Sequence, residues 1–281
     1  MKLFQNAALI TDLDGTLLTD QKTVSEKDQQ ALRYFTENGG LLGFATGRSP
    51  RSASVWRRDL PVNGPCIHLN GSLVWDPVAG KPLKIWEIEK APLLPILEWI
   101  LHNLPDTVIE LFTPEGDMFQ ISDRAYLDPY VEMNHDPYEW STLAAMKNRP
   151  WVKVLLHNSR EHLRTIHRML EETSPRRERF NFFYTLDVFL EITPAGVDKG
   201  SAMRWLCTDY RESLSERKII AAGDFDNDVH MLREADCGAA VGNAEEVAKE
   251  AADVIIADNN HSPMADLIQR LEKGELPLGE D

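Results

Sequence analysis

Two carboxylates follow the first apolar run of the sequence. The run spans 7–13 and contains Asp12, and Asp14 and Gly15 come directly after it. In an extended segment, residues i and i+2 point to the same side, so both carboxylates would enter one small site. Their repulsion would raise one pKa, and a bound divalent cation would relieve it. One carboxylate could then act as a nucleophile and the other as a general acid and base.

This pattern alone has a second interpretation. Asp-x-Asp-Gly is also an ordinary turn, because aspartate and glycine are common turn residues. The glycine also permits a sharp bend whose backbone N–H groups could hold phosphate oxygens. Further residues must therefore decide between a turn and a catalytic loop.

A second acidic segment follows another apolar run. The run 218–223 leads into Asp224, Asn227 and Asp228, whose oxygen atoms suit a hard cation. The spacing is not that of an EF-hand calcium loop. A helix start also favours aspartate, and Asp226 fits an exposed loop carboxylate. A helix start could explain one of these aspartates, but it does not explain why all of these polar residues gather directly after an apolar strand.

Two further residues fit an anion site. Thr46 ends the apolar segment 41–45 and offers a hydroxyl donor. Lys199 lies at the start of a predicted helix, where its ammonium and the backbone dipoles could face the same anion. Each signal is weak alone, since most lysines lie on the surface.

Together these segments resemble the four motifs of the haloacid dehalogenase superfamily of phosphohydrolases. The matching segments occur in the right order, and they are 12–16, 46–48, 199–200 and 223–228. The insertion between the second and third motifs resembles the C2-type cap of the Cof-like IIB branch. Asn70-Gly71 and Gly242-Asn243-Ala244 also resemble that branch, whereas 259–261 is less typical of it.

The resemblance implies a role for each matching residue. Asp12 would be the nucleophile and Asp14 the general acid and base. Mg²⁺ would be bound by the side chains of Asp12 and Asp224 and by the backbone carbonyl of Asp14, with Asp228 as a supporting residue. The residues implied on the phosphate and substrate side are Thr46, Gly47, Arg48, Asn70, Lys199 and Asn227.

The element pattern predicts how these residues are held. Apolar strands alternate with helices, which predicts an α/β fold with a Rossmann-like parallel sheet between two helical layers. Predicted strands are 7–13, 41–45, 66–69, 218–223, 237–241 and 253–257, and predicted helices are 25–38, 49–60, 199–209, 228–235, 245–251 and 263–272. Ligands bind at the carboxyl ends of such strands.

The sequence between these stretches predicts a second domain. We expect a catalytic core at 1–79 and 188–281 and an inserted α+β cap at 80–187. Most tryptophans in or near the insertion are expected to fill its core. The basic run 176–179 is expected to be a solvated turn.

Composition narrows the functional class. The chain has 281 residues, a formal net charge of -15 and a pI of about 5.0, which disfavours nucleic acid and anionic membranes as partners. Three scattered cysteines do not form a disulfide framework or a zinc motif. No apolar stretch reaches the ~18 residues of a membrane span, and the N-terminus lacks a signal-peptide pattern. These features predict a soluble cytoplasmic protein.

The prediction is therefore a phosphoric monoester hydrolase. It would hydrolyse small phosphorylated metabolites, sugar phosphates first, through an aspartyl-phosphate intermediate. A phosphomutase of the same fold is the first alternative, and a non-catalytic metabolite-binding protein is the second. The presence of both Asp12 and Asp14 argues against the second alternative.

Overall fold

The computed structural model describes residues 2–123, 137–173, 179–185 and 187–278, and it divides into two compact units. The core unit consists of Met1–Arg48, Ala53–Leu83 and Asp198–Asp281. The inserted unit consists of Ser49–Ser52 and Lys84–Val197. It runs past the sequence-based boundary at 187 because strand β11 (Phe189–Pro194) pairs with β9 and β10 of the inserted unit.

The core unit is built on a five-stranded parallel sheet with the order β14-β13-β12-β1-β2. Its strands are β1 (Ala7–Thr11), β2 (Leu41–Phe44), β12 (Lys218–Gly223), β13 (Cys237–Val241) and β14 (Val254–Ile256). All residues of β1 and β13 are buried, as expected for parallel strands covered on both faces. The predicted parallel α/β fold is confirmed.

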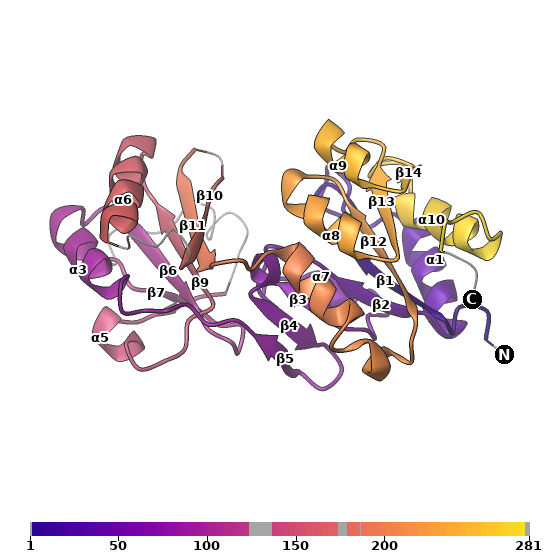
Figure 1. The fold of residues 1–281 in the computed structure, drawn as a ribbon, viewed down its shortest axis with the longest axis horizontal. Coiled ribbons are helices and arrows are strands. Elements are labelled where there is room, and N and C mark those ends of the chain that lie inside the picture. Colours follow the sequence, from indigo (N-terminus) through magenta and orange to yellow (C-terminus); the bar gives the residue numbers. More distant parts are fainter. Residues whose placement is uncertain (1, 124–136, 174–178, 186, 279–281) are drawn as a thin grey trace. The chain divides into compact units, whose positions relative to one another are not determined.

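Two groups of helices cover this sheet (Figure 1). The first group is α1 (Glu26–Glu37) and α10 (Pro263–Glu272), and the second is α7 (Lys199–Cys207), α8 (Val229–Glu234) and α9 (Glu246–Ala251). The strand order runs outward in both directions from β1 and β12, and right-handed crossovers then place the two groups on opposite faces. Short 3-10 turns complete the unit at η1 (Leu69–Gly71), η2 (Arg211–Leu214) and η3 (Asp226–Asp228).

Two predicted elements of the core unit differ from the structure. Strand β3 (Cys66–His68) does not extend the parallel sheet as a full strand. It pairs antiparallel with β4 (Leu73–Asp76) in a three-stranded sheet with β5 (Lys81–Ile85), and a single parallel bridge links Ala45 to Ile67.

The predicted helix 49–60 shortens to α2 (Ser54–Arg57). The Ser49 hydroxyl accepts a hydrogen bond from the backbone N–H of Ser52 at 3.1 Å, as an N-cap does, but residues 50–53 form turns before the helix begins.

The inserted unit is an α+β unit with a six-stranded sheet of order β10-β11-β9-β6-β7-β8. Its other strands are β6 (Val108–Phe112), β7 (Met118–Gln120), β8 (Glu139–Trp140), β9 (Lys153–His157) and β10 (Phe180–Thr185). Its helices are α3 (Leu94–Asn103), α5 (Leu143–Met146) and α6 (Arg160–Thr173). Most strand pairs are antiparallel, and β7 and β8 pair in parallel.

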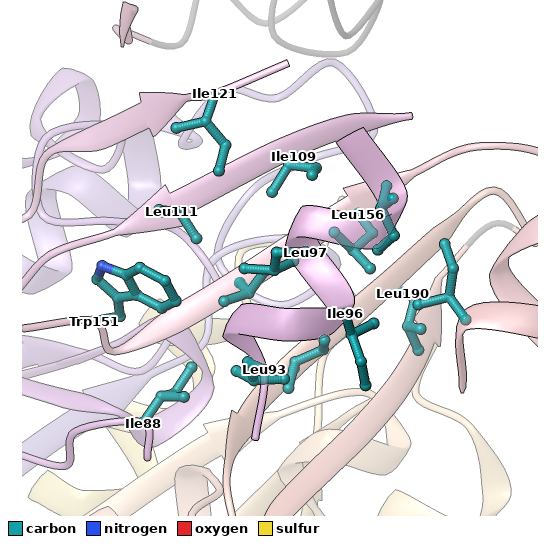
Figure 2. Close-up of a cluster of buried hydrophobic side chains, with 14 of the residues drawn as sticks. Ile88, Leu93, Ile96, Leu97, Ile109, Leu111, Ile121, Trp151, Leu156 and Leu190 are labelled. Carbon is teal, nitrogen blue, oxygen red and sulfur yellow. The ribbon is translucent and has the colours of Figure 1, made fainter. Parts of the chain in front are cut away.

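A hydrophobic core joins these helices to the sheet (Figure 2). Trp151 is fully buried in it, and its indole N–H donates to the Met146 carbonyl at 3.0 Å. Trp99 packs against the same core, so two of the tryptophans have the expected role. In the basic run, Arg179 pairs with Glu89 at 2.5 Å, and 176–178 lie outside the described residues. None of the described helices combines the length and apolar character needed to cross a membrane.

Candidate functional site

Neighbouring strand ends bring the predicted aspartates together. Strands β1 and β12 pair in parallel, and Asp12 and Asp224 follow their last residues. The backbone N–H of Asp12 donates to the Ala222 carbonyl at 2.8 Å, which continues the strand pairing as far as Asp12. Chain order reverses between these two strands, and this switch point is where open α/β sheets bind ligands.

Three carboxylates and one ammonium form the centre of the site. One oxygen each from Asp12, Asp224 and Asp228 can lie within 4.8 Å of the others. Nζ of Lys199 lies 3.0 Å from Oδ1 of Asp12 and 2.7 Å from Oδ1 of Asp228. Lys199 and Asp228 are fully enclosed, and Asp12 is 6% exposed. This donor set consists of hard oxygen atoms, so it fits a divalent cation such as Mg²⁺.

Burial dominates the electrostatics of this centre. Burial raises the pKa of Asp12 well above its usual range, and the charges of Asp228 and Asp224 act in the same direction against that of Lys199. Burial also raises the pKa of Asp224. Burial opposes the charge on Lys199, but the two adjacent carboxylates raise the pKa of its ammonium above the usual value. The ammonium therefore stays charged and offsets part of the carboxylate repulsion.

The fourth motif folds around the Asp228 carboxylate. Its Oδ2 accepts hydrogen bonds from the backbone N–H groups of Asp224 at 3.0 Å and Phe225 at 3.2 Å. A Cβ added at Gly223 would lie 2.6 Å from the Asp228 side chain, so only glycine fits there. Nδ2 of Asn227 donates to Oδ1 of Asn70 at 3.3 Å. Asp228 thus shapes the loop that carries Asp224.

The first motif packs directly on the fourth. Thr16 Oγ1 donates a hydrogen bond to Oδ1 of Asp224 at 2.7 Å. Gly15 has a φ of +85°, and a Cβ there would lie 2.4 Å from Oδ2 of Asp224. Glycine at this position allows the close approach of the two loops.

Lys199 owes its place to the start of α7. Asp198 is the N-cap of this helix. Its side chain accepts a hydrogen bond from the backbone N–H of Ser201 at 2.7 Å, and the Ser201 hydroxyl accepts one from the backbone N–H of Asp198 at 3.0 Å. This reciprocal capping fixes the first turn of the helix. A Cβ on Gly200 would lie 2.3 Å from Cβ of His230, so the third motif fits closely against α8.

The second motif and the loop after β3 complete the arrangement. The backbone N–H of Asn70 donates to the Thr46 carbonyl at 3.2 Å, and Asn70 adopts a left-handed φ of 52°. The buried Thr46 hydroxyl accepts from the Arg48 backbone N–H at 3.2 Å. A Cβ added at Gly47 would lie 3.1 Å from Oδ1 of Asn70. The two loops therefore pack against each other.

Asp14 has a different environment from Asp12. Arg48 binds both oxygens of the Asp14 carboxylate: its Nε lies 2.7 Å from Oδ2 and its Nη2 lies 3.0 Å from Oδ1. Nζ of Lys22 lies 2.8 Å from the same Oδ1. Burial acts to raise the pKa of Asp14, but hydrogen bonds and charges from Arg48 and Lys22 lower it to about 2. The cluster of three carboxylates consists of Asp12, Asp224 and Asp228 and does not include the Asp14 side chain. The predicted contact of Asp14 with the metal is through its backbone carbonyl.

Sequence reasoning assigned no role to several residues that hold the first motif. Nδ2 of Asn243 donates to the Gly15 carbonyl at 2.8 Å, and Oδ1 of Asn243 accepts from the Asn259 backbone N–H at 2.8 Å. Nδ2 of Asn259 donates to the Leu18 carbonyl at 3.1 Å and to Oδ1 of Asp20 at 3.1 Å. The paired asparagines after the last strand were a visible signal, but their partners depend on the folded chain.

Comparisons with known proteins identify the family of this chain. The family model of the haloacid dehalogenase-like hydrolases matches residues 9–268, so the chain belongs to this family. A Bacillus subtilis relative, 5-amino-6-(5-phospho-D-ribitylamino)uracil phosphatase YitU, is 27% identical over 263 residues, which cover 90% of this chain and 93% of the relative. The predicted membership of the haloacid dehalogenase superfamily is confirmed, and the predicted enzyme class agrees with the relative's name.

Solved structures share the fold. The X-ray structure of TM0651 from Thermotoga maritima has a TM-score of 0.81 and 27% identity, and the match covers 94% of this chain and 96% of that chain. A sugar phosphatase described as HAD subclass IIB has a TM-score of 0.72 at 18% identity, with 94% and 98% of the two chains covered. At that identity the second match bears on the fold alone, and it is the fold of the predicted branch.

Proposed function

We propose that this protein is a magnesium-dependent phosphatase that hydrolyses small phosphorylated metabolites through a phosphoaspartate at Asp12. The observation that carries the proposal is the contact of Asp12 with Lys199 at 3.0 Å, beside the carboxylates of Asp224 and Asp228. A structural turn has no need for a buried carboxylate next to a buried ammonium and two further acids. A nucleophile for a phosphoryl group needs both charge compensation and a cation site.

The metal would be held by the side chains of Asp12 and Asp224 and by the backbone carbonyl of Asp14. Asp228 supports the site, since it organises the loop of Asp224 through the backbone N–H groups of Asp224 and Phe225. The raised pKa values of Asp12 and Asp224 reflect buried, crowded carboxylates, and cation binding would favour their ionised forms. When bound, the cation offsets negative charge on the transferring phosphoryl group.

The reaction has two steps at phosphorus. In the first, a carboxylate oxygen of Asp12 bonds to phosphorus, the bond from phosphorus to the leaving oxygen breaks, and Asp14 donates a proton to that oxygen. In the second step, the oxygen of a water molecule attacks phosphorus while Asp14 takes a proton from that water. The bond between Asp12 and phosphorus breaks, which releases inorganic phosphate and restores the Asp12 carboxylate. The pKa of about 2 keeps Asp14 ionised before substrate binds, so Asp14 must first take up a proton from solvent to act as the acid. A bound phosphate would add negative charge beside Asp14, which raises its pKa toward the acid role.

The remaining motif residues would hold the substrate. Lys199 and Thr46 are assigned to the phosphoryl oxygens, and Gly47 lets the neighbouring loop approach closely. Asn227 bonds to Asn70 at 3.3 Å and would orient this edge of the phosphate site. Arg48 and Asn70 are assigned to positioning and substrate contact.

The substrate class follows from the family. The Bacillus subtilis relative is named as the phosphatase of a phosphoribityl compound. We therefore infer sugar phosphates and related small phosphoesters as substrates. The core unit would carry the catalysis and the inserted unit would act as the cap that selects the substrate. With a net charge of -15 and few cysteines, the inferred compartment is the cytoplasm.

The decisive experiment replaces Asp12 with Asn. Asp12→Asn should abolish magnesium-dependent phosphate release from p-nitrophenyl phosphate, because the amide is a poor nucleophile. Asp226→Asn is the matched control, since Asp226 lies on the same loop as Asp224 but is exposed. Full activity of Asp12→Asn would rule out the phosphoaspartate. With a hexose phosphate, free phosphate supports the hydrolase, whereas an isomer without free phosphate would support a phosphomutase.

A further inference from the structure

Lys22 lies outside all four motifs, yet its side chain contacts the proposed acid and base. We propose that Lys22 and Trp56 are positioning residues that hold the Asp14 carboxylate where it meets the leaving oxygen. This inference rests on the proposed function. It adds a lysine and a tryptophan to the machinery of the reaction, and neither belongs to a motif that implied a role.

Asp14 is held from two sides. Arg48 binds both carboxylate oxygens, at 2.7 and 3.0 Å, and Lys22 binds Oδ1 at 2.8 Å. Three charge-assisted hydrogen bonds leave a carboxylate little rotational freedom. Lys22 is itself 57% exposed, so its pairing contributes little to the stability of the fold. A functional role explains the contact better than a structural one.

The loop after the first motif brings Lys22 to this place. The Thr19 N–H donates to the Thr23 carbonyl at 2.9 Å, and the Lys22 N–H donates to the Thr19 carbonyl at 2.8 Å. Lys22 has a left-handed φ of 58°, an unfavourable conformation for a residue with a side chain. Asp20 in the same loop accepts hydrogen bonds from Asn259 at 3.1 Å and Asn260 at 3.0 Å. The loop is thus fixed in a form that directs Lys22 back to Asp14.

Trp56 contacts both residues that hold Asp14, through the backbone of Lys22 and the guanidinium of Arg48. Its indole N–H donates to the Lys22 carbonyl at 3.3 Å. The Arg48 guanidinium carbon lies 4.6 Å from the centroid of its ring, within the range of a cation–π contact. One side chain therefore links the loop of Lys22 to the second motif, and its loss would loosen both partners of Asp14.

The chemical consequence concerns the leaving group. A basic leaving oxygen must gain a proton as its bond to phosphorus breaks, so it depends on a correctly placed acid. Nitrophenolate delocalises its charge and depends less on that proton. A displaced Asp14 should therefore slow phenyl phosphate more than p-nitrophenyl phosphate, two substrates of nearly the same shape.

The test compares kcat/KM for these two substrates, because kcat/KM reports the step in which the leaving group departs. In Lys22→Met we expect kcat/KM to fall about tenfold for phenyl phosphate and less than about twofold for p-nitrophenyl phosphate. Lys22→Arg keeps a cation and should restore most of the loss. Lys27→Met is the matched control, since Lys27 is an exposed lysine of the same segment.

Trp56 is tested by separating its two contacts. Trp56→Phe keeps a ring beside Arg48 but loses the hydrogen bond to Lys22, so it should show a smaller selective loss than Trp56→Leu. Equal losses for both substrates in Lys22→Met would overturn the proposal, since they would mean that Lys22 binds phosphate. Unchanged values would also overturn it. Failure of the proposed function would look different, because the wild-type protein would then release no phosphate from either substrate.

Discussion

The ammonium of Lys199 lies 3.0 Å from the carboxylate of Asp12, and both side chains are buried. The same nitrogen is 2.7 Å from Asp228, so one cation compensates two acids. An exposed ion pair at these distances would contribute little to the stability of the fold, but a buried charge that loses its partner destabilises the fold strongly. The pair therefore links the chemistry of the site to the stability of the fold.

Lys199→Met should both inactivate and destabilise the protein. The change leaves Asp12 and Asp228 buried without their cation, and removal of one partner of a buried pair costs about 3–5 kcal/mol. The raised pKa of Asp12 lets it gain a proton, so we expect the lower end of this range. Urea unfolding measures the loss. Adding Asp228→Asn should restore part of it, because Asn keeps an oxygen for the backbone bonds; no recovery would contradict this account.

Removal of the cation should lower the melting temperature. Binding of Mg²⁺ to the folded state alone at a hundredfold excess over Kd stabilises by about 2.7 kcal/mol. We expect the Tm of the wild-type protein to rise when MgCl₂ is added and to fall back when EDTA is added. In Asp224→Asn, which removes a proposed ligand, the rise in Tm should be smaller. Asp226→Asn should keep the full rise. An equal rise in both variants would place the cation elsewhere.

The sequence was sufficient to predict the five strands of the parallel sheet and the acidic residues that follow two of them, although the predicted strand 66–69 lies in another sheet. Apolar runs such as 7–13 and 218–223 have few alternatives to buried strands, and parallel strands bring their carboxyl ends to one edge. Asp12, Asp224 and Asp228 could therefore be placed together without coordinates. The start of α1 was also predictable, since the predicted helix 25–38 begins at Ser25, whose hydroxyl accepts from the Asp28 N–H at 3.1 Å as an N-cap does.

Residues that act through loops could not be predicted in the same way. Lys22 contacts Asp14 from a loop in which Lys22 itself has a left-handed φ of 58°, and no periodicity of the sequence encodes that. Lys153 is buried and forms an ion pair at 2.7 Å with the partly buried Glu191 across β9 and β11, although each looks like a surface residue in the sequence. The inserted compact unit extends to Val197 and not to 187 for a related reason, because strand pairing and not composition assigns β11 to this unit.

Acid should weaken the protein through His68. Burial lowers the pKa of this imidazole to about 4 from a usual 6.5, and its Nδ1–H donates to the Arg48 carbonyl at 3.1 Å. Between these pKa values the unfolded chain binds a proton that the folded chain does not, so stability falls as pH drops from 6.5 to 4. The full effect is about 3 kcal/mol. Urea unfolding at several pH values should show a flatter profile for His68→Asn; an unchanged profile would contradict the assignment.

Asn259→Asp should destabilise the loop of the first motif. Nδ2 of Asn259 donates to the Leu18 carbonyl and to Asp20, both at 3.1 Å, and the side chain is only 4% exposed. A carboxylate of the same shape would face one carbonyl oxygen and another carboxylate, at a cost of about 1–3 kcal/mol. Urea unfolding measures this cost, with His261→Ala as the control because that imidazole is exposed.

The repulsion in Asn259→Asp can be separated from a general loss of packing. Adding Asp20→Asn exchanges the amide and the carboxylate between the two positions, so a donor again faces an acceptor across this contact. The double variant should therefore be more stable than Asn259→Asp alone, although the Leu18 carbonyl still lacks its original donor. If the double variant were no more stable than Asn259→Asp alone, the contact between Asn259 and Asp20 would not be what holds this loop, which positions Lys22 beside Asp14.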